Sequence, residues 1–225
     1  MNDTILGLII GIISSSVAGI LLHFFLNKEH DTRIKIKVFD PTESYSSSNF
    51  YAILKKTISK AKEEVVQYAE GFNTEMPERH EKAKEYTDSI RAVLRDRPSV
   101  RWIRIQTLNP YDEGWLDLQH SLIKDFPSQF KLFLFNNRLG DHITSIVLID
   151  PKTKKSKVFI MISKPRNLGG ETKVNVTHTG VMIQGSRILS ESLYDRLDSL
   201  LDVSKKHITT IKPDTDIKAI AEQGE

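Results

Sequence analysis

The amino-acid sequence predicts an α/β protein in which one N-terminal transmembrane helix precedes a mixed, largely parallel sheet covered by helices on both faces. Three observations lead to this prediction. Residues 4–26 contain no charged side chain. The chain then alternates short apolar runs, typical of strands, with longer segments of helical periodicity, which favours parallel strands joined by helices. Two later apolar runs flank a lysine-rich turn, which indicates an antiparallel hairpin.

The uncharged segment 4–26 is expected to cross a membrane. As a helix it would be about 34 Å long, enough for the hydrocarbon core of a bilayer. No lysine or arginine precedes it, so a cleaved signal peptide is not expected. Lys28, Arg33, Lys35 and Lys37 follow it, which predicts a single-pass protein of the cell membrane with a cytoplasmic C-terminal domain. The expected division is 1–3 extracytoplasmic N-terminus, 4–26 transmembrane helix, 27–32 juxtamembrane linker, 33–205 cytoplasmic α/β domain and 206–225 flexible tail.

Small residues form a stripe along this segment. Gly7, Gly11, Ser15 and Gly19 recur every four residues, so they share one face of a helix. Such a face lets a second helix approach closely, which predicts a homo-oligomer formed through the membrane. The alternative is that glycine and serine are simply common in transmembrane helices.

The first part of the domain alternates strands and helices. In the first strand Ile34, Ile36 and Val38 alternate with lysines, which predicts an edge strand with one solvated face. The helices carry apolar residues at helical spacing, such as Phe50 and Leu54 in the first of them. The expected strands are 33–39, 64–69, 100–108 and 130–135, and the expected helices follow the polar loop 41–49 and cover 77–95 and 113–124.

The second part of the domain changes to consecutive strands. Residues 144–150 and 157–163 are expected to be strands joined by the sequence PKTKKS, and 173–185 a further strand. A closing helix is expected over 189–204. The last twenty residues contain Pro213, alternating charges and few aromatic residues, so a mobile tail is expected.

Composition excludes several classes of function. The chain has no cysteine, which rules out thiolate catalysis and cysteine metal sites. With 32 Lys and Arg against 29 Asp and Glu, it is not a polybasic nucleic-acid binder. Neither the GxxxxGK[ST] nor the GxGxxG phosphate loop occurs, which argues against a mononucleotide hydrolase and a dinucleotide oxidoreductase. His80, His120 and His178 are dispersed without metal-ligand spacing, so neither a metal nor a cofactor is expected.

Two basic patterns have more than one interpretation. Arg97, Arg101 and Arg104 with Trp102 fit either a nucleic-acid patch or the solvated face of a strand. Four lysines lie in or beside the turn of the expected hairpin: Lys152, Lys154, Lys155 and Lys157. They fit a solvated turn or, close to a membrane, contact with anionic headgroups.

Between about 49 and 204 the chain contains, in this order, the segments ILKKTISKAKEEVV, RAVLRDRPSVRWIRI, DHITSIVLIDPK and MISKPRN. In this order of segments the domain resembles one half of a phospholipase D-like domain. The family's motif is His-x-Lys-x4-Asp, in which the histidine attacks phosphorus and the lysine holds the phosphate oxygens. His142 matches the histidine, but Thr144 and Ile149 stand in place of the lysine and aspartate. Asp150 comes one place late, and only one copy of the motif region is present.

The resemblance therefore implies the fold of this family, with helices around a mixed sheet, but not its intact catalytic motif. No catalytic residue is expected if the protein is a binding module. If it is an enzyme, His142 is the expected nucleophile, because the family's reaction uses a free imidazole beside a cation. The alternative for His142 is a buried histidine bonded to backbone.

A ligand site is expected where the strands end, because ligands of parallel α/β sheets bind beyond the carboxyl ends of the strands. The loop 136–142 combines a guanidinium, two amides and a glycine turn, groups that suit a phosphate or a nucleotide base. The family topology would bring 164–167 close to this loop. The alternative is a plain polar loop. The candidate ligand-binding residues are Asn109, Asn136, Asn137, Arg138, His142, Lys164, Arg166 and Asn167.

Two classes of function fit these features, beside a third in which the helix is only a tether. In the first, a noncatalytic cytoplasmic sensor binds a phosphate-containing ligand or a protein partner and controls an oligomeric membrane helix, as a bacterial stress or antiviral defence effector. A relative of this class is a cyclic-oligonucleotide-sensing Rossmann-like domain behind a membrane helix. In the second, the protein is a membrane-tethered phosphodiesterase of the phospholipase D type acting on lipid or nucleic acid. The expected partners are further copies of the chain, membrane lipid and a nucleotide or other phosphate-containing ligand, whereas a nucleic-acid partner is not expected.

Overall fold

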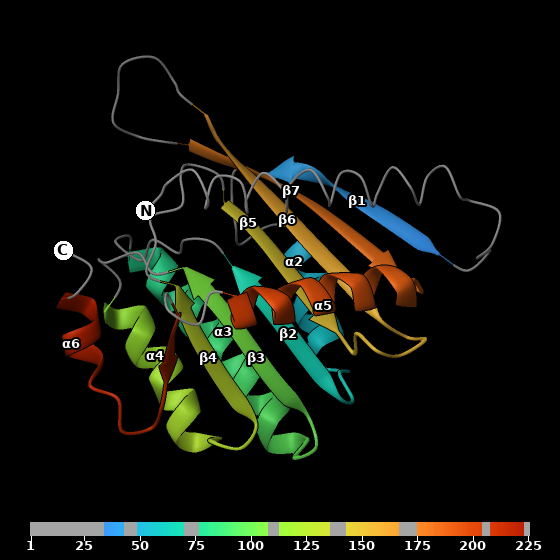
Figure 1. Ribbon diagram of the computed structural model, residues 1–225. Coiled ribbons are helices and arrows are strands. Elements are labelled where there is room, and N and C mark those ends of the chain that lie inside the picture. Colours follow the sequence, from blue (N-terminus) through green and yellow to red (C-terminus); the bar gives the residue numbers. More distant parts are fainter. Residues whose placement is uncertain are drawn as a thin grey trace. The chain divides into compact units, whose positions relative to one another are not determined.

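The computed structural model describes residues 34–42, 49–69, 77–107, 113–135, 143–166, 175–203 and 208–222. Figure 1 shows these residues as a sheet with helices packed against it. The strands are β1 (Lys35–Thr42), β2 (Glu64–Ala69), β3 (Arg101–Thr107), β4 (Phe130–Phe135), β5 (Ile143–Ile149), β6 (Lys157–Arg166), β7 (Asn175–Gln184) and β8 (Ile208–Ile211). The helices are α2 (Asn49–Ile58), α3 (Pro77–Asp96), α4 (Glu113–Asp125), α5 (Arg187–Val203) and α6 (Ile217–Glu222).

The expected transmembrane helix 4–26 lies outside the described residues. Among the residues that are described, no helix has the length and apolar character needed to cross a membrane. The strands and helices described here belong to one compact unit, Lys35–Glu225. Every strand and helix expected between 33 and 204 has a counterpart in this unit, and the expected bounds of 64–69 and 130–135 match β2 and β4.

The sheet is mixed, and the expectation that it is largely parallel is wrong. Its strand order is β1-β7-β6-β5-β2-β3-β4-β8. Only the pairings of β3 with β2 and with β4 are parallel among those described, and the other five are antiparallel. The alternation of strand and helix stops at β4. The chain then runs through three consecutive antiparallel strands, which fill the space between β1 and β2.

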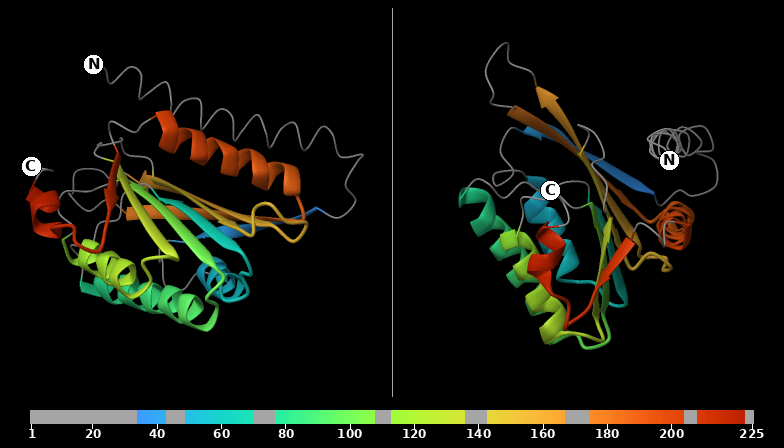
Figure 2. Two further views of the ribbon diagram at one scale, coloured as in Figure 1. Left: turned by 60° about the horizontal axis from the view of Figure 1, so that its bottom comes forward. Right: turned by 60° about the vertical axis from the view of Figure 1, so that its left-hand side comes forward.

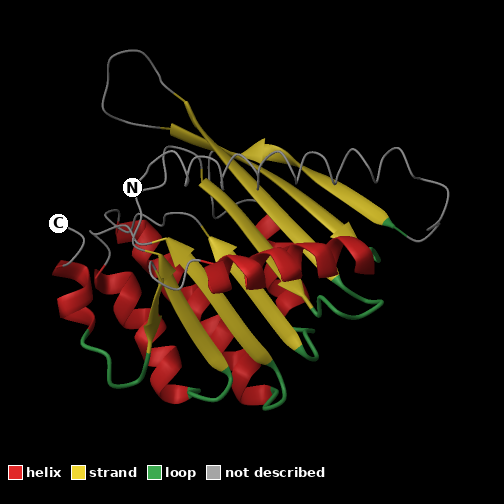
Figure 3. Cartoon of the chain, in the orientation of Figure 1, coloured by secondary structure: helices red, strands yellow, loops and turns green. Residues whose placement is uncertain are grey.

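Helices cover both faces of the sheet, as expected from the sequence. Figure 2 shows α2, α3 and α4 on one face and α5 on the other. The register explains the division, because Val65, Trp102 and Phe130 are paired neighbours that pack together with residues of α2, α3 and α4. In Figure 3 the loops that precede β2, β3 and β4 gather at one end of the sheet. We call this the amino end and the opposite end the carboxyl end.

Strand β1 is an edge strand, as expected, but its apolar residues do not alternate between core and solvent as its sequence suggests. Ile36 and Val38 are 44% and 66% exposed, whereas Phe39 is buried against the ring of Phe50, 5.2 Å between ring centroids. Ile36 pairs with Ile183, so it points to the face that carries α5. Because β1 is at the edge of the sheet, Ile36 and Val38 stay accessible to solvent on that face. Phe39, on the opposite face, provides the contact of β1 with the core.

The expected flexible tail is wrong over most of its length. Strand β8 pairs antiparallel with β4, and α6 packs against α4. Ile211 and Ile217 are buried. His120 of α4 holds the turn between β8 and α6, because its Nε2 lies 3.2 Å from the carbonyl oxygen of Lys212 and 3.0 Å from that of Pro213. Isolated isoleucines among charged residues are thus enough to complete the sheet and cover α4.

Candidate functional site

Three parallel strands end at the carboxyl end of the sheet. Strands β2, β3 and β4 finish at Ala69, Thr107 and Phe135, and β5 begins there at Ile143 because it is antiparallel to β2. The segments that connect these strands therefore start or finish at the same end. This is the arrangement on which the expected ligand site depends.

Most of the expected site residues lie outside the described part of the chain. The described part gives backbone positions for two of them: Lys164 and Arg166 lie in β6, paired with Thr177 and Asn175 of β7. The residues outside the described ranges are Asn109, Asn136, Asn137, Arg138, His142 and Asn167 of the ligand site and Gly7, Gly11, Ser15 and Gly19 of the helix stripe. Their roles stay predictions.

The described residues contain a buried polar cluster at the middle of the sheet, on the face covered by α3 and α4. Arg104 of β3 donates from Nη1 to Oε1 of Gln119 and from Nη2 to Oε1 of Gln106, both at 3.3 Å. Gln119 of α4 in turn donates to Oγ1 of Thr87 in α3 at 3.2 Å. Gln67 is the β2 partner of Arg104 in the register and accepts from the Tyr86 hydroxyl at 3.3 Å. We define Gln67, Thr87, Arg104, Gln106 and Gln119 as the buried polar cluster.

The positive charge of Arg104 is held in a site of low polarity. Its side chain is 3% exposed, and its guanidinium carbon lies 4.8 Å from the ring centroid of Trp115. The two amide oxygens and the ring face replace part of the water that a guanidinium loses on burial. A charge kept in such surroundings acts over a longer range than a solvated one, because the effective dielectric constant is low.

This burial corrects both interpretations of the arginines around β3. Arg104 and Trp102 lie beneath α3 and α4, so they form neither a nucleic-acid patch nor a solvated strand face. Arg101 is exposed and points to the other face of the sheet. The alternation places Trp102 and Arg104 on one face of β3 and Ile103 and Ile105 on the other, but it does not show that α3 and α4 cover the arginine.

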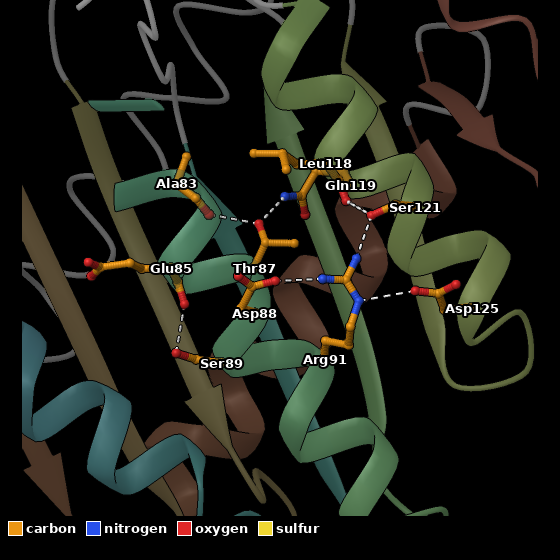
Figure 4. A network of polar contacts seen from close by, with 10 residues as sticks. All are labelled: Ala83, Glu85, Thr87, Asp88, Ser89, Arg91, Leu118, Gln119, Ser121 and Asp125. Atoms are coloured by element: carbon orange, nitrogen blue, oxygen red, sulfur yellow. Dashed lines mark hydrogen bonds and ion pairs between the residues drawn. The ribbon is translucent and has the colours of Figure 1, made fainter. Parts of the chain in front are cut away.

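A second polar network fixes α3 against α4 beside the cluster. Figure 4 shows Arg91 of α3 between Asp88 and two residues of α4. Its nitrogens lie 2.6 Å from the Asp88 carboxylate, 3.0 Å from that of Asp125 and 2.7 Å from the Ser121 hydroxyl. Figure 4 also shows the bond from Gln119 to Thr87 one turn away. The Arg91 contacts therefore hold the two helices in the alignment that the buried polar cluster requires.

A different titratable group lies at the amino end, on the face that carries α5. The Glu64 carboxylate is buried 3.4 Å from the Arg101 guanidinium and is hydrogen-bonded to Tyr194. Burial raises the pKa of Glu64, although Arg101 and Lys152 act against this. Burial, followed by the charge of Glu64, also raises the pKa of Tyr194. Glu64 and Tyr194 lie at the opposite end of the sheet from the expected ligand loops.

Asp150 has a structural role in the described residues. Its carboxylate accepts hydrogen bonds from the backbone N–H groups of Lys62, Glu63 and Glu64 at 2.8 to 3.2 Å. Its backbone has a φ of 49°, a left-handed conformation that aspartate tolerates better than most residues. The residue that comes one place late for the phospholipase D motif thus ties the β5–β6 turn to the start of β2.

Within the described ranges, no group of three or more His, Asp or Glu side chains is arranged to hold a metal ion. The chain matches no protein-family model and no curated protein. Chemically, the described residues offer a buried cation at the middle of β3, amides that orient it, and the backbone of a basic segment of β6 at the carboxyl end.

Proposed function

We propose that this chain is a single-pass protein of the cell membrane whose noncatalytic cytoplasmic domain binds a phosphate-containing ligand or protein partner and controls an oligomeric membrane helix. The observation that carries the binding role is Arg104, a guanidinium buried beneath α3 and α4 at the middle of β3 and oriented by two glutamines. Its charge favours an anion at the carboxyl end of the sheet, where Arg138 and Lys164 are the candidate surface ligands. A bacterial stress or antiviral defence effector is the setting that we propose for such a sensor.

The element order supports a phospholipase D-like fold for the domain. From α2 to β4 helices and strands alternate, and β5, β6, β7 and the closing helix α5 follow. This is the order on which the resemblance rests. The Rossmann-like alternative receives less support, since that class has a mostly parallel sheet and the described pairings are mostly antiparallel.

The experiment that tests the proposed function measures oligomer mass and membrane potential together. Wild type and Gly11→Leu are compared after solubilisation in detergent, and the same two forms are expressed inducibly in cells that report membrane potential. We expect a defined oligomer that Gly11→Leu disrupts, with a potential change seen for wild type alone, because leucine separates the helices. Ile13→Leu, off the glycine stripe, is the matched control. A monomer in every form contradicts the proposal.

A second candidate function, the membrane-tethered phosphodiesterase, is favoured by one feature of the register. Strand β6 continues past Ser163, the partner of Ile143, with Lys164, which pairs with Thr177 of β7. The backbone of β6 therefore places a basic residue at the carboxyl end of the sheet, where β5 begins. Under this proposal Lys164 supplies the cation that the motif lacks at Thr144. Under this proposal His142→Ala and Lys164→Ala each abolish hydrolysis of a generic phosphodiester such as bis(p-nitrophenyl) phosphate, and absence of hydrolysis by wild type excludes it.

A further inference from the structure

The amino end of the sheet brings together three basic segments from distant parts of the chain. Lys35 of β1 pairs with Gln184 of β7, which pairs with Lys157 of β6. The start of β1, the β5–β6 turn and the start of α5 therefore lie at one end, as Figure 1 shows. This end is opposite the strand ends that lead to the candidate ligand loops.

The chemistry of this end is that of a surface that contacts lipid. Lys35, Lys154 and Lys155 are exposed, and Ile188 in the first turn of α5 is 71% exposed. Exposed lysines around an exposed large apolar side chain suit an anionic bilayer, where the ammonium groups meet headgroups and the apolar group enters the interface. Glu63 is an exposed acid at the same end.

Two other carboxylates of this end are already engaged and do not oppose such contact. Asp150 accepts three backbone N–H groups. Glu191 lies 2.7 Å from Arg187 in an ion pair.

Asp96 and Asp125, the last residues of α3 and α4, are further exposed acids of this end, and Asp125 is paired with Arg91. With Lys60 and Lys62 before β2, the exposed lysines outnumber these acids, so positive charge dominates this end.

The short connection between the expected membrane segment and β1 predicts that the amino end of the sheet lies near a membrane. The uncharged segment 4–26 is joined to Lys35 by residues 27–34. Eight residues span at most about 28 Å even when fully extended. If 4–26 is inserted in a bilayer, the first residue of β1 is held within this distance of the headgroups. The domain can then come within the roughly 8–10 Å over which the electrostatic attraction acts at physiological salt.

We propose that the amino end of the sheet, through Lys35, Lys154, Lys155 and Ile188, docks on the anionic headgroups of the membrane in which the chain is anchored. The inference rests on the proposed membrane anchor. It adds an orientation: the carboxyl end, with the candidate ligand loops, faces away from the membrane and is open to the cytoplasm.

The full chain lends itself to a direct test, because it has no cysteine and accepts a single fluorescent label. Lys155→Cys labels the proposed surface, and Lys84→Cys labels an exposed position in the half of α3 nearer the carboxyl end. Each protein is reconstituted in phosphatidylcholine vesicles with or without phosphatidylserine, with a nitroxide quencher on the lipid headgroups. We expect about fivefold stronger quenching at 155 than at 84 with phosphatidylserine, and loss of this difference without it or at high salt.

A charge variant gives the second arm. Lys35→Gln with Lys154→Gln should lower the ratio of docked to undocked domain by about fivefold for each lysine. The matched control, Lys84→Gln with Lys218→Gln, removes the same charge from the half of α3 nearer the carboxyl end and from α6, and should leave quenching of the label at 155 unchanged.

Each contrary outcome is informative. Equal quenching of the two labels in anionic vesicles overturns the docking proposal, as does quenching that ignores lipid charge. The label at 155 could instead be shielded more strongly as the protein concentration rises, independently of phosphatidylserine content. This result assigns the surface to a second copy of the chain and overturns lipid docking. Extraction of the protein by alkaline carbonate overturns the membrane anchor itself, whereas retention with equal quenching overturns docking alone.

Discussion

Glu64 shows how burial of one carboxyl group links folding to pH. Its pKa in the folded protein lies above the ordinary value of 4.5 for a glutamate, chiefly because of burial. The folded state therefore holds this proton more tightly than the unfolded state. The contribution of Glu64 to stability is fully present below 4.5 and is lost as pH rises through the raised pKa.

Glu64→Gln should remove this dependence. Glutamine still accepts the Tyr194 hydroxyl hydrogen bond but carries no charge to desolvate, and the ion pair that it loses is to an exposed arginine and is weak. We expect the free energy of unfolding of the variant, relative to wild type, to increase with pH from acid to neutral. Urea denaturation across this range measures it. Glu63→Gln, at the exposed neighbour, should give a difference that is flat with pH, and an equal slope for both variants would refute the assignment to Glu64.

Arg104 raises a question of role, because a buried cation can serve stability, binding or both. Arg104→Met leaves the amide oxygens of Gln106 and Gln119 without this donor, which should cost about 2–4 kcal/mol in the free energy of unfolding. Replacing all three residues, as Arg104→Met, Gln106→Leu and Gln119→Leu, removes the buried polar groups together and should recover most of that loss. Lys131→Met, an exposed change in β4, is the stability control.

The same variants separate stability from binding. If Arg104 provides the positive potential for an anion, the triple variant stays folded but loses the rise in melting temperature that inorganic phosphate or AMP gives wild type. The measurement is thermal unfolding over a range of ligand concentrations. A triple variant that is stabilised by phosphate as strongly as wild type would limit the cluster to a structural role.

At the level of elements, β7 and α2 approach so closely that glycine is required at one position. A Cβ on Gly180 would lie 2.3 Å from Cδ2 of the Phe50 ring. The ring is fixed by edge contacts to Phe39 and Phe159, so it cannot move away freely. Gly180→Ala should therefore destabilise the protein by about 1–3 kcal/mol, as measured by urea denaturation.

A compensating change tests the cause. Phe50→Leu makes room for the added methyl group, so the cost of Gly180→Ala should be smaller in that background than in wild type. Equal costs in both backgrounds would place the strain in the strand backbone instead of the ring contact.

The sequence pattern predicts where each strand and helix lies along the chain better than it predicts which strands pair in the sheet and in which direction. The runs 64–69 and 130–135 are apolar enough to define β2 and β4. Strand direction was mispredicted, because alternation of strand and helix fixes the direction of β2, β3 and β4 only. Nothing local in Ile146 or Leu148 reveals that β5 lies antiparallel to β2. Arg104 was likewise misread, since a single arginine between isoleucines looks the same whether a helix covers it or not. The loop residues of the expected ligand site stay a prediction.

For the whole molecule, the C-terminal segment decides how the sheet is closed. A chain that stops after Ser204 lacks β8 and α6, which exposes the edge of β4 and the part of α4 that α6 covers. Apolar strands with a free edge promote association between molecules. The expectation of a mobile tail implies instead that this truncation changes nothing.

We therefore expect the form truncated after Ser204 to unfold at a clearly lower temperature and to aggregate, because Ile211 and Ile217 lose burial worth about 1.5–3 kcal/mol each. A chain that stops after Glu222 removes only the last three residues and is the matched control. His120→Phe, which keeps α4 apolar but removes the donor to Lys212 and Pro213, should act in the same direction with a smaller effect. Hydrogen exchange over 208–222 measures it: faster exchange there, with 64–69 unchanged, identifies His120 as the residue that holds the C-terminal segment on the sheet. Unchanged exchange in both regions would assign that attachment to the isoleucines alone.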